Sequence, residues 1–385
     1  MPVRTIDVDQ HLFESRTTWS DYIDPALRAD ALRIEDDDAG WPWLVWRGRR
    51  LTNIEVPFPE DSPAIGRDHL RRLAGEPATA SFEELVPAAY GSATARLATL
   101  DEFGLDQAVL FPNYGLLWER MLAEDRLAQR ANAQAYNRFM AEVISDGGGR
   151  LHGVAHLMLH DPAWAVAEIA RVAADGVRLA MIAPAPVDHK PLSHPDFDPV
   201  WAACCAHGVA PVFHVSGFES PLDPAWHLGE PADGELLLDS IFLWLAPAVA
   251  LANLILTGTL ERFPDLRIGV VELTAGWVPS FLLHLDGASD FHAQRHGGPF
   301  RRLADRPSDY FLRQVRVAAL PYEMPNRLVK SVGGQTFMIG SDWPHAEGVA
   351  HPLQAAARAT DGLADDEVAG LMADNAAWLL GIRWA

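Results

Sequence analysis

The chain has 385 residues, 49% of them hydrophobic and 22% charged, which is the composition of an ordinary globular protein large enough to fold without disulfides. Its formal net charge of −21 argues against nucleic acids and anionic membranes as partners, so a small molecule is the expected ligand. The two cysteines are adjacent, and no segment has the apolar length of a signal peptide or a transmembrane helix, so we expect a cytoplasmic location.

Eight short apolar runs alternate with helical stretches along the chain. The expected strands cover residues 3–8, 107–112, 151–158, 177–182, 210–215, 267–273, 315–320 and 336–339. The expected helices between them include residues 95–103, 125–144, 163–173, 198–206 and 239–262. Most of the runs are apolar throughout and rich in β-branched residues, which is typical of parallel strands that are buried on both faces.

This alternation predicts an α/β fold, either a closed (β/α)8 TIM barrel or a doubly wound sheet. No glycine-rich dinucleotide fingerprint follows any expected strand, which favours the barrel. We therefore predict a single TIM-barrel domain over residues 1–385, with a long insertion after the first strand. The insertion, residues 12–94, is expected to form a lid or a pocket wall on the catalytic face. Aromatic residues that would suit such a wall are Trp41, Trp43, Trp46 and Phe58.

Polar residues lie where several of the expected strands end, and the C-terminal strand ends form the active-site face of a TIM barrel. Asp9 and His11 are two positions apart, so they share one face of the first strand, where a carboxylate and an imidazole can chelate a divalent ion. His214 ends the fifth strand, Glu272 lies at the end of the sixth, and Asp342 follows the eighth. Each signal is weak alone, but together the five side chains would ring one mouth and would suit Zn²⁺, Mn²⁺ or Fe²⁺.

Further polar and aromatic residues are expected near the same mouth. Glu14 and His156 are additional candidates for metal ligation, and Glu14 is alternatively expected to orient the ring of His11. The residues expected to contact a substrate are Asn113, Tyr114, Trp277 and His345.

Several longer motifs resemble the amidohydrolase-related family of metal-dependent TIM barrels, which includes aminocarboxymuconate-semialdehyde and resorcylate decarboxylases. The motifs are DVDQHLFE at residues 7–14, PVFH at 211–214, LERFPDL at 260–266, AGWVP at 275–279, GSDWPH at 340–345 and DNA at 374–376. The resemblance implies an oligomer, either a homodimer or a hetero-oligomer with a homologous chain. It also implies metal ligands at Asp9, His11, His214 and Asp342.

Two departures from the decarboxylases of that family bear on the reaction. Those enzymes tend to carry a histidine at the end of strand six, where this chain has Glu272. They also tend to carry a His-x-His or Glu-x-His pair where this chain has Asp9 and His11. The D-x-H-x-x-E pattern resembles a large branch whose members are mostly described as hydrolases.

The first expectation is therefore a metal-dependent hydrolase of a small carboxylate, amide or ester. Zinc is the first choice of ion, with manganese or iron as alternatives, and Glu272 or Asp342 would take a proton from a water that the metal activates. One alternative is a non-oxidative decarboxylase of an aromatic or unsaturated acid, with Arg313 or Arg316 as the anchor for the substrate carboxylate. A second alternative is a dinuclear iron or manganese oxygenase component that acts with a homologous subunit, and a third is a partner subunit without activity of its own.

Overall fold

The computed structural model describes residues 3–116, 118–218, 220–228, 237–298 and 303–383. Eight parallel strands form one sheet, and in spatial order they are β1 (Ile6–Leu12), β5 (Gln107–Pro112), β6 (Leu151–His156), β7 (Leu179–Ile182), β8 (Ala210–Phe213), β9 (Ile268–Val270), β10 (Val315–Ala319) and β11 (Phe337–Ile339). The sheet closes on itself because the backbone N–H of His11 donates to the carbonyl of Trp343 (2.9 Å). The N–H of Asp342 likewise donates to the carbonyl of Asp9 (2.8 Å). The predicted (β/α)8 TIM barrel is confirmed.

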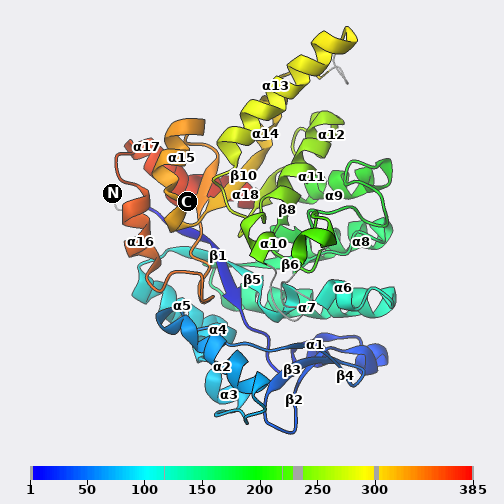
Figure 1. Cartoon of the computed structure of the whole chain (residues 1–385), viewed down its shortest axis with the longest axis vertical. Helices are drawn as coiled ribbons and strands as arrows, with labels where there is room; N and C mark the ends of the chain where they lie inside the picture. The colour runs from blue at the N-terminus through cyan, green and yellow to red at the C-terminus, as the bar shows by residue number, and fades with distance from the viewer. Residues whose placement is uncertain (1–2, 117, 219, 229–236, 299–302, 384–385) are drawn as a thin grey trace.

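Helices cover the outside of the barrel (Figure 1). They are α5 (Ala93–Phe103), α6 (Trp118–Met121), α7 (Arg126–Asp146), α8 (Pro162–Ala174), α9 (Asp198–His207), α10 (Leu237–Ile241), α11 (Leu245–Leu256), α12 (Thr259–Arg262), α13 (Val278–His296), α14 (Pro307–Gln314), α15 (Pro325–Val332), α16 (Pro352–Ala359), α17 (Asp365–Ala369) and α18 (Asn375–Leu380). Within the described ranges, no helix combines the length and the apolar character needed to cross a bilayer.

Aliphatic side chains fill the interior of the barrel. Ile6, Val8 and Val154 are among those that point inward from the strands, and all are buried. Leu379 of α18 packs into the same cluster from the N-terminal ends of the strands, where its side chain approaches Gly269. The lower part of the barrel is therefore closed by packing, and polar groups can gather only at the C-terminal strand ends.

The segment between β1 and α5 folds as a small subdomain beside the mouth of the barrel. Its elements are α1 (Thr18–Tyr22), β2 (Arg33–Asp36), β3 (Pro42–Trp46), β4 (Arg49–Asn53), α2 (Pro63–Leu73), α3 (Phe82–Leu85) and α4 (Ala88–Gly91), and the three strands form an antiparallel sheet. The N–H of Phe13 donates to the carbonyl of Tyr90 (2.8 Å), and the Ser62 hydroxyl donates to the carbonyl of Ala346 (2.9 Å). The insertion thus contacts the loops that follow β1 and β11.

Most elements lie within two residues of the expected boundaries, and three differ in ways that have a clear physical reason. β1 continues to Leu12, because its backbone goes on pairing with β5 beyond a register irregularity between Asp7 and Gln10. The single helix expected at 239–262 is three helices, and the left-handed backbone of Gly258 (φ 75°) separates the last two. β9 is shorter than expected, because Glu272 (φ 55°) has left the β region two residues beyond its end.

Candidate metal centre

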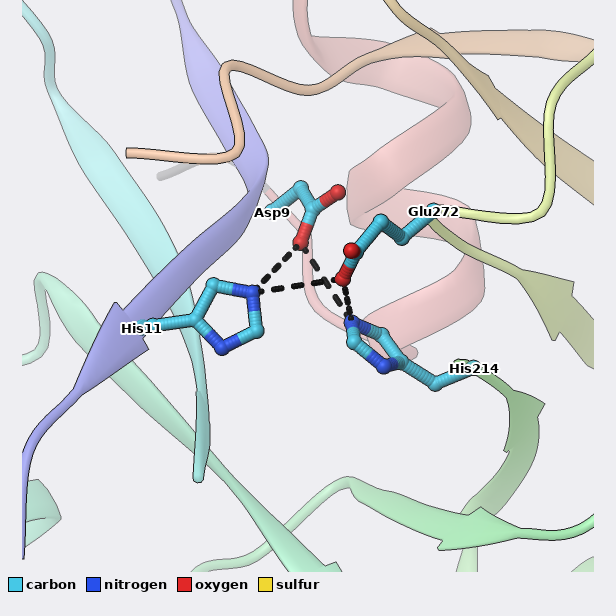
Figure 2. A group of neighbouring side chains, drawn as sticks. All are labelled: Asp9, His11, His214 and Glu272. Carbon is cyan, nitrogen blue, oxygen red and sulfur yellow. Dashed lines mark ion pairs between the residues drawn. The ribbon is translucent and has the colours of Figure 1, made fainter. Parts of the chain in front are cut away.

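Four side chains, from one strand and from the segments that follow two others, converge at the C-terminal mouth of the barrel (Figure 2). Asp9 and His11 come from β1, His214 follows β8 and Glu272 follows β9. The Nε2 atom of His214 lies 3.1 Å from Glu272 Oε2 and 3.6 Å from Asp9 Oδ1. The Nε2 atom of His11 lies 3.5 Å and 3.6 Å from the same two oxygens. Two imidazole nitrogens and two carboxylate oxygens therefore face a common centre.

Asp342 reaches this group from the far end of the chain. It follows β11, and its Oδ1 atom lies 3.3 Å from His11 Nε2. Its backbone is left-handed (φ 55°), a costly conformation for a residue with a Cβ and one that recurs at functional sites. Gly340 permits the close approach of the two strands, because a Cβ at that position would lie 2.7 Å from the Cβ of Asp9. Local strain and a glycine thus place Asp342 beside the first strand.

The hydrogen bonds of His11 and His214 determine which nitrogen faces the group. His11 Nδ1 lies 2.8 Å from the carbonyl oxygen of Pro112, and His214 Nδ1 lies 2.9 Å from that of Val215. A carbonyl oxygen only accepts, so each Nδ1 carries a hydrogen, and in the neutral ring Nε2 is then the nitrogen that offers a lone pair to a cation at the centre. A backbone carbonyl that fixes the tautomer in this way is the usual companion of a metal-ligating histidine.

The atoms that face the centre lack hydrogen bonds within the described structure. Burying such atoms without a partner costs on the order of 1–3 kcal/mol each, and more when the group is charged. The unpartnered atoms are both carboxylate oxygens of Asp9 and of Asp342, Nε2 of His11 and of His214, and Oε2 of Glu272. A cation bound between them would satisfy all of these atoms at once.

The pKa values of the buried side chains also indicate a site for a cation. Burial alone would lower the pKa of His11, but the neighbouring carboxylates of Asp342, Asp9 and Glu272 raise it well above its ordinary value. Burial and the nearby charge of Asp342 raise the pKa of Glu272. A divalent ion would relieve the repulsion between these carboxylates. The side chains present therefore fit such an ion, which Asp9, His11, His214, Glu272 and Asp342 would hold.

Glu14, expected either as a ligand or as the residue that orients His11, lies outside this group. Its carboxylate accepts the backbone N–H groups of Tyr114 and Gly115, both at 2.9 Å. The Nδ1 atom of His11 faces the carbonyl of Pro112 instead. The role of Glu14 in the structure is to tie the end of β1 to the loop that follows β5.

We expect Glu14→Gln to flatten the pH dependence of stability. Burial raises the pKa of Glu14 from its ordinary value of 4.5 to about 7, against the effect of its backbone hydrogen bonds. The folded state then holds the proton more tightly than the unfolded chain does, so stability falls as the pH rises from about 4.5 to about 7. A shift of this size corresponds to roughly 3 kcal/mol.

Denaturant unfolding at pH 4.5 and pH 8 measures this effect. The loss of stability between the two pH values is expected to be about 3 kcal/mol smaller in Glu14→Gln than in the wild type. Glu102→Gln, a change at an exposed glutamate, serves as the control and is expected to behave like the wild type. Equal losses in Glu14→Gln and the wild type would contradict the raised pKa.

His156, expected as another ligand, also lies outside the group. It ends β6, and its Nε2 atom lies 3.1 Å from Oε2 of Glu119, which belongs to α6. The His156 side chain is buried and its Nδ1 atom lacks a described hydrogen-bond partner, whereas the Glu119 side chain is 26% exposed. Because Val154 points into the barrel, the two-residue alternation of the strand directs His156 inward as well.

The four residues expected to contact a substrate lie in different places. Asn113 Oδ1 is 2.8 Å from His345 Nε2, and His345 Nδ1 is 2.8 Å from Asp342 Oδ1, so both residues border the group. Tyr114 is buried, and its hydroxyl has no hydrogen-bond partner within the described ranges. Trp277 lines a cavity of about 780 Å³ between α11 and α13.

The two arginines considered as anchors for a substrate carboxylate are directed away from the mouth. Arg316 donates to the carbonyl of Val315, and its guanidinium lies over the ring of Trp378 at 3.9 Å, on the side closed by α18. Arg313 pairs with Asp305 on the surface at 3.1 Å. Neither side chain can serve as the anchor in this structure.

Arg96 is a buried residue of the site region that the sequence did not single out. It belongs to α5, and it donates to the carbonyl of His11 (2.6 Å), the side chain of Gln10 (3.1 Å) and the carbonyl of Ala89 (2.9 Å). Its guanidinium also lies over the ring of Trp343 at 4.5 Å. Arginine is common on exposed helix faces, so no pattern in the sequence distinguished this one.

A closed barrel of eight parallel strands, with a buried carboxylate–imidazole group at its C-terminal mouth, defines a TIM-barrel protein of the metal-dependent type. Residues 6–382 match the family model described as amidohydrolase, so the chain belongs to the amidohydrolase family of enzymes. A search of curated proteins finds no match.

Solved structures with the same fold include several enzymes of this kind. The amidohydrolase map2389c from Mycobacterium avium subsp. paratuberculosis K-10 is 26% identical, with a TM-score of 0.76 over 99% of this chain and 100% of that chain. The 5-carboxyvanillate decarboxylase LigW from Sphingomonas paucimobilis is 21% identical, with a TM-score of 0.65 over 99% and 100%. A manganese complex of 5-carboxyvanillate decarboxylase from Novosphingobium aromaticivorans is 17% identical, with a TM-score of 0.67 over 99% and 97%.

Proposed function

We propose that the protein is a non-oxidative decarboxylase of a small aromatic or unsaturated acid and that it uses a divalent ion, with Mn²⁺ preferred. The observation that carries the proposal is the burial of the ligand group, in which the side chains of Asp9, His11 and Asp342 are 0% exposed. A carboxylate that enters such a site loses its hydration, whereas carbon dioxide has little to lose, so burial favours the release of carbon dioxide. The decarboxylases among the similar structures support this choice over the hydrolase expected from the sequence.

The ligand set supports Mn²⁺ over the zinc expected first. Three carboxylates and two imidazoles are oxygen-rich, and no cysteine belongs to the group, which suits manganese. Manganese is bound in similar decarboxylase structures from Novosphingobium aromaticivorans and Polaromonas sp. JS666. A divalent ion held here would supply positive charge that binds the substrate carboxylate and stabilises the charge left behind when the carbon–carbon bond breaks.

The reaction needs a proton donor as well. When carbon dioxide leaves, the electron pair of the broken bond stays on the substrate carbon, and a proton takes the place of the carboxylate. We assign its delivery to Nδ1 of His156, which is buried, unpartnered among the described residues and on the inner face of its strand. Glu119 holds the other ring nitrogen and is partly exposed, so it connects the imidazole to solvent.

The insertion is proposed to keep water from the site. The ring of Tyr90 packs against Phe13 (centroids 4.9 Å apart) and against Trp343 (5.1 Å), next to the ends of β1 and β11. These aromatic contacts cover the side of the mouth that carries Asp9 and Asp342. A wall of this kind lowers the local dielectric constant and suits an aromatic substrate.

Carbon dioxide release from a panel of acids tests the proposed function. We expect chelator-treated protein to be inactive. We expect Mn²⁺-loaded protein to release labelled carbon dioxide from carboxyl-labelled hydroxybenzoic acids, and the organic product to take up no oxygen from labelled water. A parallel panel of esters and amides is the comparison. Hydrolysis of that panel without carbon dioxide release would overturn the proposal in favour of the hydrolase.

His156→Gln tests the assigned proton donor. Loss of a general acid lowers rates by roughly 10²–10⁴-fold, and the bound metal is expected to stay at the wild-type level because His156 is not a ligand. His152→Gln, at a partly exposed position of the same strand, is the control. Wild-type turnover in His156→Gln would exclude His156 as the donor.

A further inference from the structure

The cavity between α11 and α13 is large enough to hold part of a substrate. Its volume of about 780 Å³ lies within the range of roughly 300–1,000 Å³ that small-molecule pockets occupy. Most of its described wall is apolar, so it suits a hydrocarbon or aromatic group better than a charged one. The apolar side chains of the wall include Trp244, Leu245, Ala248, Val249, Trp277 and Phe281.

Two segments of the chain join this cavity to the candidate metal centre. Thr274 lines the cavity and lies two residues beyond Glu272, in the segment that follows β9. Tyr322, which follows β10, also lines the cavity. Burial raises the pKa of the Tyr322 hydroxyl, and neighbouring carboxylates that include Asp342 and Glu272 raise it further. The hydroxyl is therefore within electrostatic range of two ligand carboxylates, and the cavity begins beside the mouth of the barrel.

The part of the wall nearest to the mouth is held in place by hydrogen bonds. The backbone of Thr274 is left-handed (φ 57°), which is rare for a β-branched residue, and its carbonyl accepts the indole N–H of Trp277 (2.9 Å). The carboxylate of Glu323 accepts the N–H groups of Ala275 (2.8 Å) and Gly276 (3.0 Å) and ties the segments after β9 and β10 together. Strained backbone recurs at ligand sites, and a pre-formed wall lowers the cost of binding.

Part of the apolar wall is in contact with water. Val249 and Tyr322 are 58% and 66% exposed, although both line the cavity. Apolar surface that stays in water costs free energy, which a hydrophobic group recovers when it covers that surface. A ligand that begins at the metal centre and extends past Tyr322 would cover it.

We propose that this cavity holds an apolar arm of the substrate, so that the acid bound at the metal centre carries a hydrocarbon or aromatic extension. The inference rests on the proposed function for the carboxylate end of the substrate, and it adds the class of acid. Trp277 and Phe281 would pack against the arm, and Tyr322 would lie where the arm leaves the mouth. These residues determine specificity and take no part in breaking the carbon–carbon bond.

Binding of linear saturated acids tests the inference without turnover. Mn²⁺-loaded protein is titrated in a calorimeter with acids of increasing chain length, from butanoate to decanoate. We expect the affinity to rise roughly fourfold for each methylene group that the cavity buries. Metal-free protein is expected to bind the same acids far more weakly, because their carboxylate then has no anchor. Equal affinity along the series, or equal binding with and without the ion, would overturn the inference.

Two variants that narrow the cavity locate the binding of the chain. Ala252→Trp adds a ring from α11, and we expect it to bind butanoate like the wild type but to lose the rise with chain length. Ser280→Trp, at an exposed position of the α13 wall, is expected to do the same and serves if the first variant does not fold. Ala202→Trp, at an exposed alanine of α9, is the control and should show the wild-type series. A wild-type series in both cavity variants would show that the chains bind elsewhere.

The possible results separate this inference from the proposed function. Equal affinity along the series, in a protein that releases carbon dioxide from hydroxybenzoic acids, would remove the apolar arm and leave the decarboxylase. A rise with chain length that both cavity variants abolish, in a protein that decarboxylates no acid, would support the arm and overturn the decarboxylase.

Discussion

Replacing His214 with alanine is expected to abolish tight binding of the divalent ion and to lower turnover by on the order of 10³-fold or more. The Nε2 atom of His214 is buried and unpartnered and lies 3.1 Å from Glu272 and 3.6 Å from Asp9, so its removal deletes a central ligand. A bound ion that stabilises charge in the transition state contributes several kcal/mol, and each 1.36 kcal/mol is about tenfold in rate.

Two measurements separate weaker metal binding from lost turnover in this variant. Metal content is read after gel filtration in metal-free buffer, and turnover is read with a large excess of Mn²⁺. His207→Ala, at an exposed histidine of α9, is the control and should match the wild type in both. An His214→Ala protein that folds and retains the ion with wild-type affinity would show that the ion binds elsewhere.

Arg96→Met is expected to destabilise the folded protein by about 3–5 kcal/mol, the range for removing one partner of a buried charged network. The guanidinium is fully buried and bonds to the carbonyls of His11 and Ala89 and to the side chain of Gln10, and all three acceptors would be left without it. The change also removes a positive charge that interacts with the buried carboxyl of Asp7.

Denaturant unfolding of metal-free protein measures this loss. Methionine keeps much of the volume of the side chain, so a large loss reports on the hydrogen bonds and the charge and not on a cavity. Arg47→Met is the matched control, because its ion pairs with Asp30 and Asp125 are exposed and should contribute less than about 1 kcal/mol. A similar small loss in Arg96→Met would show that the buried network does not hold the end of β1.

The barrel and the location of its site were predictable from local patterns. Runs such as 107–112 and 210–213 are apolar on both faces. Eight such runs that alternate with helices are typical of parallel strands buried inside a barrel. The same alternation placed His214 and Asp342 at strand ends that share one mouth. The extent of β1 was harder to predict, because Asp9 and His11 interrupt its apolar pattern while its backbone goes on pairing with β5.

The partners of individual side chains depend on contacts that are distant in sequence. Glu14 accepts N–H groups about a hundred positions along the chain, and His156 meets Glu119 of α6, so neither partner follows from strand position alone. The antiparallel sheet of the insertion also went unpredicted, since its strands are short and partly exposed. The contact between His345 and Asn113 likewise joins residues more than two hundred positions apart, which a sequence pattern cannot place side by side.

The central claim is that the buried group at the C-terminal mouth is a metal centre. The most direct test is the anomalous diffraction of crystals grown with Mn²⁺, recorded on both sides of the manganese absorption edge. We expect strong anomalous density between the facing atoms of Asp9, His11 and His214, within bonding distance of all three. Manganese density found only at surface carboxylates, with ordered water between these three side chains, would contradict the claim.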